Sequence, residues 1–253
     1  LGGEAAYIGR VNDDQLGEIF VHDMRSLGVD VRLQPAAANA PTARCHVLIS
    51  ADGQRTMQTY LGACTELAVS DVTAETVGAP DVILLEGYIW DLEEGPDVAA
   101  KAIEIARRNG SKVALSLSDS FCVERHRDAF HDAVRDGVDI VVADEDEVNA
   151  LLRTDSFDDT LKALDDYDNL FAMTRSEKGS VIRHGDETIV QAATPVEKLV
   201  DTTGAGDAYT AGFLYGWADG KSLAESARLG TLCATRVIQQ VGGRIERGLL
   251  DDF

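Results

Sequence analysis

A run of small residues followed by a carboxylate, residues 199–213, has the composition of an anion site beside a base. It reads Leu-Val-Asp-Thr-Thr-Gly-Ala-Gly-Asp-Ala-Tyr-Thr-Ala-Gly-Phe. An apolar segment ends at Val200, a glycine turn follows, and apolar residues then recur at helical spacing. A helix start offers unpaired N–H groups to an anion, and small residues let the anion approach closely. Asp207 would repel a phosphate, but it could take a proton from a hydroxyl group that attacks one. Taken alone, Gly-x-Gly-Asp is equally open to an ordinary acidic residue in the first turn of a helix.

The overall composition limits the classes of function. The 253 residues are enough for one large domain, or for one domain with a small appendage. The net charge of −21 argues against a nucleic-acid or anionic-membrane surface, since both need clustered Lys and Arg. The four cysteines are far apart, so we expect reduced thiols in a cytoplasmic protein rather than disulfides or a zinc site. We find no apolar run of the ~20 residues that a membrane span needs and no signal peptide.

Strands and helices alternate through most of the chain. Residues 4–11 have the pattern of a strand, and a helix capped by Asp13 or Asp14 follows to about residue 27. Further strands are expected at residues 81–86, 112–117, 138–143, 170–174, 180–184 and 188–191. Helices are expected at residues 96–109, 123–135, 145–152, 157–167, 206–218 and 223–241. This rhythm predicts an α/β fold with a mainly parallel sheet, helices on both faces and ligands at the carboxyl ends of the strands.

One segment breaks the rhythm. Residues 29–33, 44–50 and 55–61 have strand patterns with no helices between them, and Ala-Asp-Gly-Gln at 51–54 is a turn signal. We therefore expect a small β lid at residues 29–64 that covers a site. The larger α/β domain would comprise residues 1–28 and 65–253.

Three motifs resemble those of one enzyme family. Besides Asp-Thr-Thr-Gly-Ala-Gly-Asp at 201–207, they are Asp-Ile-Val-Val-Ala-Asp-Glu-Asp-Glu at 139–147 and Thr-Arg-Ser-Glu-Lys-Gly at 174–179. Together they resemble the ribokinase-like, or phosphofructokinase-B, sugar and nucleoside kinases, nearly end to end. Residues 52–63, 86–91, 117–121 and 237–244 are most similar to the bacterial adenosine-kinase-like branch. The first residues resemble the segment after the family's Gly-Gly-x-x-x-Asn substrate motif, so we expect that motif upstream of Leu1.

The resemblance implies transfer of the γ-phosphoryl group of ATP to a primary hydroxyl of a small molecule. Asp207 matches the catalytic base, and Gly204, Ala205 and Gly206 would offer N–H groups to the transferring phosphoryl group. Arg55 matches an arginine that closes over the active site and could pair with phosphate. An exposed hairpin arginine is the alternative.

The resemblance also implies metal ions. Glu147 matches the glutamate that helps to place Mg²⁺, often through water, whereas a solvated helix-start carboxylate is the alternative. The motif's Asn is replaced by Asp144, which puts that residue's nucleotide contact in question. Asp201 and Thr203 match positions around a K⁺ site that is built mostly from backbone carbonyls, and Asp201 could equally cap a turn.

The nucleotide contacts are assigned in the same way. Thr174 and Gly179 match the nucleotide loop, but Ser176 replaces its first glycine, which puts the turn geometry in question. Lys178 could supply a cation near the phosphates or lie on the surface. Thr231 stands where ribokinases often have an Asn near the nucleotide base.

The acceptor is the open part of the prediction. Met57, Thr59 and Leu61 alternate on one face of a strand, so they could form an apolar floor for a nucleobase or simply pack the lid. Adenosine, phosphorylated at its 5′-hydroxyl, is our first choice. The alternatives are a sugar kinase for ribose, fructose or 2-keto-3-deoxygluconate, and a catalytically incomplete nucleotide-binding module. The resemblance allows a monomer or a homodimer.

Overall fold

A six-stranded sheet forms the centre of the computed structural model, which describes residues 1–35, 40–51 and 53–245. The strand order is β10 (Glu187–Gln191), β9 (Ser180–His184), β8 (Leu170–Thr174), β7 (Ile140–Asp144), β6 (Lys112–Ser116) and β5 (Val82–Glu86). Strands β5 to β8 are parallel, and β9 and β10 extend the sheet as an antiparallel hairpin. The predicted mainly parallel sheet is therefore confirmed. Asp52 of the predicted turn and residues 246–253 of the predicted large domain lie outside the described residues.

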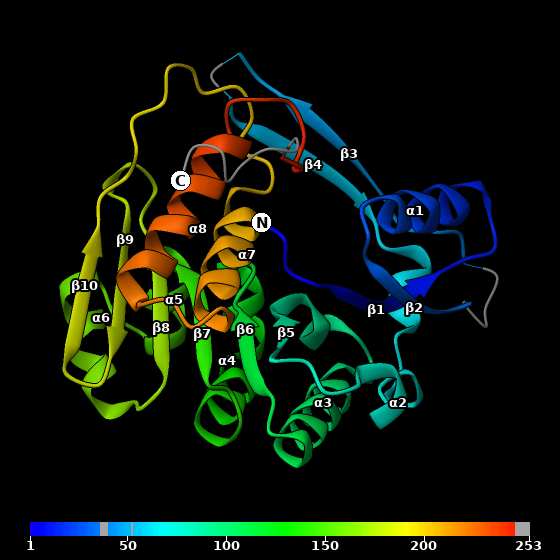
Figure 1. Cartoon of the computed structure of the whole chain (residues 1–253), viewed down its shortest axis with the longest axis horizontal. Coiled ribbons are helices and arrows are strands. Elements are labelled where there is room, and N and C mark those ends of the chain that lie inside the picture. The colour runs from blue at the N-terminus through cyan, green and yellow to red at the C-terminus, as the bar shows by residue number, and fades with distance from the viewer. Residues whose placement is uncertain (36–39, 52, 246–253) are drawn as a thin grey trace.

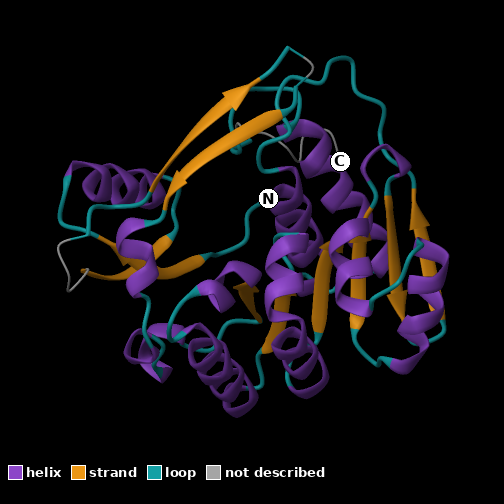
Figure 2. Ribbon diagram, turned by 180° about the vertical axis from the view of Figure 1, so that it is seen from behind, coloured by secondary structure: helices purple, strands orange, loops and turns teal. Residues whose placement is uncertain are grey.

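Helices cover both faces of this sheet. Helices α7 (Ala205–Ala218) and α8 (Leu223–Val237) lie on the face toward the viewer in Figure 1. The opposite face is covered by α3 (Gly95–Asn109), α4 (Ser120–Asp136) and α5 (Glu145–Leu152), which are in front in Figure 2. The short helices α2 (Ala74–Val77) and α6 (Phe157–Ala163) complete the layers. Among the described residues, no helix is both long enough and apolar enough to cross a membrane.

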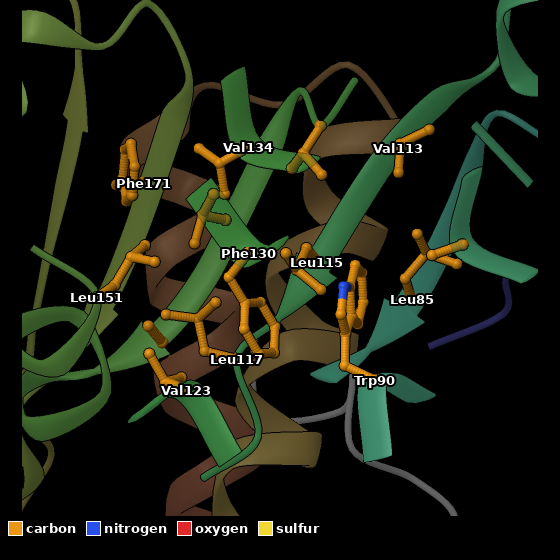
Figure 3. Close-up of a cluster of buried hydrophobic side chains, with 14 of the residues drawn as sticks. Leu85, Trp90, Val113, Leu115, Leu117, Val123, Phe130, Val134, Leu151 and Phe171 are labelled. Atoms are coloured by element: carbon orange, nitrogen blue, oxygen red, sulfur yellow. The ribbon is translucent and has the colours of Figure 1, made fainter. Parts of the chain in front are cut away.

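Alternation along the strands explains why two helical layers can pack. Val113 and Leu115 point to the side of α3 and α4, where they join Phe130 and Trp90 in the cluster shown in Figure 3. The rings of Trp90 and Phe130 stack with their centroids 4.8 Å apart. Ala114, between the two strand residues, belongs to the cluster on the side of α7 and α8. Burial of each large apolar side chain contributes about 1.5–3 kcal/mol, so this double core fixes the edge of the sheet that carries the site.

The first part of the chain forms a separate pair of strands. Strand β1 (Ala6–Val11) pairs in parallel with β2 (Asp30–Pro35), and the connecting helix α1 (Gln15–Ser26) is capped by the Asp14 side chain. In the described residues β1 pairs with no strand of the six-stranded sheet. The predicted domain boundary after residue 28 therefore crosses the β1–β2 pair, and the division into a lid at 29–64 and a larger domain stays a prediction.

Strands β3 (Arg44–Ile49) and β4 (Arg55–Tyr60) form a two-stranded antiparallel sheet, which we call the hairpin. Its base is closed by a hydrogen bond of 2.9 Å from the Ala63 N–H to the Pro41 carbonyl. From there it passes over the molecule from the side of α1 to the end of α8 (Figure 1). This arrangement has the form of the small β sheet that the sequence pattern predicts.

Candidate active site

The carboxyl edge of the parallel sheet brings the predicted nucleotide residues together. Strand register places Asp144, the last residue of β7, directly opposite Thr174, the last residue of β8. The next residue pair along the edge is Thr174 with Ser180, and Ser180 accepts a hydrogen bond of 2.9 Å from the Tyr209 hydroxyl of α7. Since Tyr209 lies two residues after Asp207, this bond ties the start of α7 to the same edge.

Residues 201–206, which lead into α7 and which we call the glycine turn, are held by two close approaches. Gly204 has a φ of 77°, a left-handed conformation that side chains disfavour. A Cβ atom there would lie 2.8 Å from Cα of Gly243, in the loop after α8. The buried Asp201 carboxylate holds the same two segments, because it accepts hydrogen bonds from Thr203 and, at 2.9 Å, from the Gly242 N–H. The Thr203 bonds, chiefly, lower the pKa of Asp201.

The start of α7 leaves a carboxylate and backbone donors open. Asp207 is exposed, and no described residue donates a hydrogen bond to its side chain. A Cβ atom on Gly206 would meet nothing within 4 Å. Within the described chain, the N–H groups of Gly206 and Asp207 have no backbone acceptor, whereas Ala205 donates to the Thr202 carbonyl at 3.3 Å. The geometry leaves Gly206 and Asp207, rather than Ala205, with N–H groups available to an anion.

The tip of the hairpin contacts this turn. Nη1 of Arg55 donates to the Thr202 hydroxyl at 2.7 Å, and the Thr202 N–H donates to the Gly53 carbonyl at 3.4 Å. Register puts Arg55, Met57 and Thr59 on one face of the hairpin, opposite Ile49, Val47 and Cys45 in turn. Because Arg55 points to the glycine turn, we call this the inner face. Leu61 follows β4 and is 49% exposed, and Met57 is 48% exposed. Both side chains are therefore available to a ligand.

Glu147 lies at the start of α5 in a capping box with Asp144. The Asp144 side chain accepts from the Glu147 N–H at 2.8 Å, and the Glu147 side chain accepts from the Asp144 N–H at 2.9 Å. Asp and Asn are equally good caps, so Asp144 keeps this part of the motif's geometry. Burial, followed by the charges of Asp144, Asp119 and Asp146, raises the pKa of Glu147 to about 8.

This acidic surrounding fits a divalent cation held largely by water and phosphate. No group of three or more His, Cys, Asp or Glu side chains in the described residues is arranged to bind a metal. Mg²⁺ ordinarily keeps several waters and is bound through one or two carboxylates plus substrate phosphates. Glu147 and Asp144 are the residues that could hold it, and a cation would relieve the repulsion that raises the pKa of Glu147.

The nucleotide loop keeps its turn despite the serine substitution. Ser176 has a φ of 51°, so it takes the left-handed conformation for which a glycine would be the usual residue. A Cβ atom on Gly179 would lie 2.0 Å from the Gln191 carbonyl oxygen, so a glycine is required there. Nζ of Lys178 lies 3.5 Å from the Glu145 carboxylate, and the Lys178 side chain is 57% exposed. Thr231 is buried in α8, with 8% of its surface exposed.

Three further residues with raised pKa values, which the sequence motifs do not include, are Glu86, Tyr7 and Tyr88. Glu86 ends β5, and partial removal from water, followed by the charge of Asp207, raises its pKa. Glu86 in turn contributes to a raised pKa of Tyr7, after burial. The Tyr88 hydroxyl donates to the Ser118 carbonyl at 3.3 Å, and burial together with Asp119, Glu147, Cys122 and Glu86 raises its pKa to about 12. Their position at the carboxyl end of strand β5 is the one signal that could have singled out Glu86 and Tyr88.

Comparison with known proteins identifies the family of this chain. Residues 1–247 match the pfkB family of carbohydrate kinases. The adenosine kinase of Sinorhizobium meliloti has a similar structure, with 47% identity, a TM-score of 0.95, and coverage of 100% of this chain and 77% of that one. A probable sugar kinase of Rhizobium etli CFN 42 has 43% identity and a TM-score of 0.94 over 99% of this chain and 76% of its own. A 5-dehydro-2-deoxygluconokinase of Clostridium perfringens is 24% identical over 94% of this chain and 74% of its own.

The chain belongs to the pfkB family of carbohydrate kinases. Its fold is the ribokinase-like α/β fold, and its class of activity is phosphoryl transfer to an alcohol group of a sugar or nucleoside.

Proposed function

We propose that the protein transfers the γ-phosphoryl group of ATP, with Mg²⁺, to the 5′-hydroxyl of adenosine. The observation that carries the proposal is the start of α7, where the Asp207 carboxylate and two N–H groups lie beside open space and have no partner among the described residues. A base, an anion site and room for the reacting group are what attack of a hydroxyl on a phosphoryl group requires.

Each residue has a distinct task in this proposal. Asp207 takes the proton of the attacking hydroxyl, and the N–H groups of Gly206 and Asp207 bind the charge that develops on the phosphoryl oxygens. Arg55 reaches the same turn from the hairpin and is placed to pair with a phosphate oxygen. Gly204 gives the turn its shape.

The nucleotide and its metal would occupy the β7–β8 end of the edge. Thr174, Gly179 and Lys178 form the nucleotide loop, with Thr231 on α8 as a further contact. Glu147 and Asp144 would hold Mg²⁺, which neutralises phosphate charge when bound.

We also propose a K⁺ site around Asp201 and Thr203. Because the Asp201 carboxylate already accepts bonds from Thr203 and Gly242, K⁺ would take mainly backbone carbonyls there.

The acceptor subsite favours an uncharged molecule with a flat apolar part. Val47, Met57 and Leu61 make the inner face of the hairpin apolar, which suits a nucleobase. Glu86 and Asp207 are both carboxylates that feel each other's charge, and each disfavours a further negative charge nearby. A neutral nucleoside meets both conditions, whereas the carboxylate of 2-keto-3-deoxygluconate meets neither.

A coupled assay of ADP formation with adenosine, ribose, fructose and 2-keto-3-deoxygluconate tests the proposal. We expect the highest kcat/KM with adenosine. If adenosine is inert while a sugar turns over, the sugar-kinase alternative replaces it. If ATP binds but no acceptor is phosphorylated, the chain is a nucleotide-binding module.

Glu86→Gln tests the charge argument separately. Removing one carboxylate should narrow the preference for ribose over 2-keto-3-deoxygluconate by about tenfold, the factor that ~1.4 kcal/mol corresponds to. Glu75→Gln, a change at an exposed residue of α2, is the matched control and should leave the ratio unchanged. An unaltered ratio in Glu86→Gln would contradict the charge argument without touching the role of Asp207.

A further inference from the structure

Four contacts join segments that are distant in the sequence into a closed ring. The first lies at the base of the hairpin, where the Thr42 N–H donates to the Asp14 carboxylate at 2.8 Å. Asp14 is also the cap of α1, since it accepts from the Gly17 N–H at 2.9 Å. Thr42 is 5% exposed and Asp14 is partly exposed, so this joint is partly buried. The hairpin is therefore fixed to α1.

The second and third contacts involve the glycine turn. At its tip the hairpin reaches the turn through Arg55 and Thr202, which are 2.7 Å apart. The turn is joined to residues 239–245, which we call the strap, by the Gly242 N–H and the Asp201 carboxylate at 2.9 Å. Figure 1 shows the strap, the red segment after α8, beside the end of the hairpin.

The fourth contact closes the ring. Nη1 of Arg244 in the strap pairs with the Asp23 carboxylate of α1, across 221 positions of sequence. The Gln240 side chain donates to the Arg244 carbonyl and braces the strap from within. The order of the ring is thus α1, hairpin, glycine turn, strap and α1 again.

We propose that Asp23 and Arg244 are positioning residues, whose ion pair holds the strap so that the glycine turn is ordered before substrates bind. This rests on the proposed role of the glycine turn in phosphoryl transfer, but not on which acceptor is used. The ion pair acts through Gly242 and Asp201, since neither Asp23 nor Arg244 belongs to the turn. When it is broken, substrate binding has to order the turn, and part of the binding energy is spent on that ordering.

Loss of the ion pair between Asp23 and Arg244 should therefore change KM rather than kcat. The two side chains are 47% and 54% exposed, so the ion pair is a screened surface pair. Asp23→Arg and Arg244→Asp should each raise KM for ATP and for the acceptor about two- to fivefold, the range that exposed pairs give, with little change in kcat. High salt should raise KM of the unmodified protein and have less effect on either variant.

The charge swap, Asp23→Arg with Arg244→Asp, is the decisive variant. It should bring KM back close to the value of the unmodified protein. It should also restore the hydrogen-exchange protection of the Gly242 amide, which the single variants lose. Glu18→Arg, an exposed carboxylate on the same helix, is the matched control and should behave like the unmodified protein. Single variants indistinguishable from Glu18→Arg, or a swap no better than either single variant, would overturn the proposal. Exchange at Gly242 needs no turnover, so it tests the ring even if the proposed acceptor is wrong.

Discussion

Arg55 and Thr202, which are 147 positions apart in the sequence, are joined by a hydrogen bond of 2.7 Å from the guanidinium to the hydroxyl. Among the described residues of the hairpin, Arg55 is the only charged residue of the inner face. The bond places its side chain next to the glycine turn. A phosphate bound at the turn would compete with Thr202 for the same guanidinium. We therefore expect Arg55 to exchange the Thr202 hydroxyl for phosphate when a phosphate ligand binds.

Removal of the arginine should cost more than removal of the hydroxyl. We expect Arg55→Ala to lower kcat/KM by about 10²-fold, because a charge-assisted contact to phosphate is worth up to ~3 kcal/mol. Thr202→Val should cost less than about fivefold, because the contact it removes is exposed and water can replace the hydroxyl. Arg44→Ala, on the outer face beside Tyr60, controls for loss of a hairpin arginine. Equal losses in Arg55→Ala and Thr202→Val would mean that the arginine only closes the hairpin.

The base assignment is tested by Asp207→Asn. The amide keeps the size of the side chain but cannot accept the proton, so kcat should fall by about 10² or more while ATP affinity changes no more than a few-fold. Steady-state rates and calorimetric ATP titration measure the two quantities. Asp219→Asn, at the other end of α7, should have neither effect. An unchanged kcat would falsify the role of Asp207 as base.

Two glycines of the turn should separate stability from activity. Gly204→Ala meets both the left-handed φ and the Gly243 backbone, so it should lower the free energy of unfolding by about 1–2 kcal/mol or more. Gly206→Ala has open space and a helical position, so stability should be unchanged or higher by up to ~1 kcal/mol. Its methyl group would fill the space proposed for the phosphoryl group, and kcat should fall by about 10². Denaturant unfolding and kinetics on both variants measure these effects, and a fully active Gly206→Ala would argue against that location.

The raised pKa of Glu147 should make the stability of the protein fall as the pH rises. Its pKa is about 8 in the folded protein against an ordinary value of 4.5, so the folded state binds more protons than the unfolded state between these pH values. Stability of the metal-free protein should therefore fall as pH rises through this window. Glu147→Gln removes that loss, so the variant should match the unmodified protein near pH 4.5 and exceed it near pH 8.

Glu225 provides the opposite control, because it has the same capping-box position in α8 but a lowered pKa. Glu225→Gln should lose stability at pH values above the ordinary pKa of a glutamate. Thermal unfolding in the presence of a chelator measures both variants. If the stability of Glu147→Gln and of the unmodified protein changed in parallel with pH, the raised pKa of Glu147 would be contradicted.

Periodicity predicted the elements of the sheet well and their ends less well. The helix expected to reach residue 241 ends at Val237, because the Ile238 carbonyl accepts from the N–H groups of Val200 and Asp201. Those partners are nearly 40 positions away, so no local pattern could show them. The pairing of β1 with β2 was missed for the same reason, since partners of a strand are set by tertiary packing.

The three motifs could be recognised because the residues of each are close together in the sequence. The register that places Asp144 opposite Thr174 follows once two parallel strands are neighbours. Glu86 and Tyr88 were missed because a carboxylate and a phenol at the end of a strand have no distinctive spacing. The sequence left open the turn geometry at Ser176, where serine replaces a glycine. The backbone of Ser176 takes the left-handed conformation without a glycine.

The hairpin has no third strand in the described structure, and its residues alternate between an inner and an outer face. If the inner face contacts the acceptor as proposed, substitutions at Val47, Met57 or Thr59 would change that contact without repacking the double core of the sheet. Selection can act on those positions almost independently of the positions that keep the protein folded. One scaffold can thereby exchange one acceptor for another through a few mutations in a strand pair, while the phosphoryl-transfer turn stays constant.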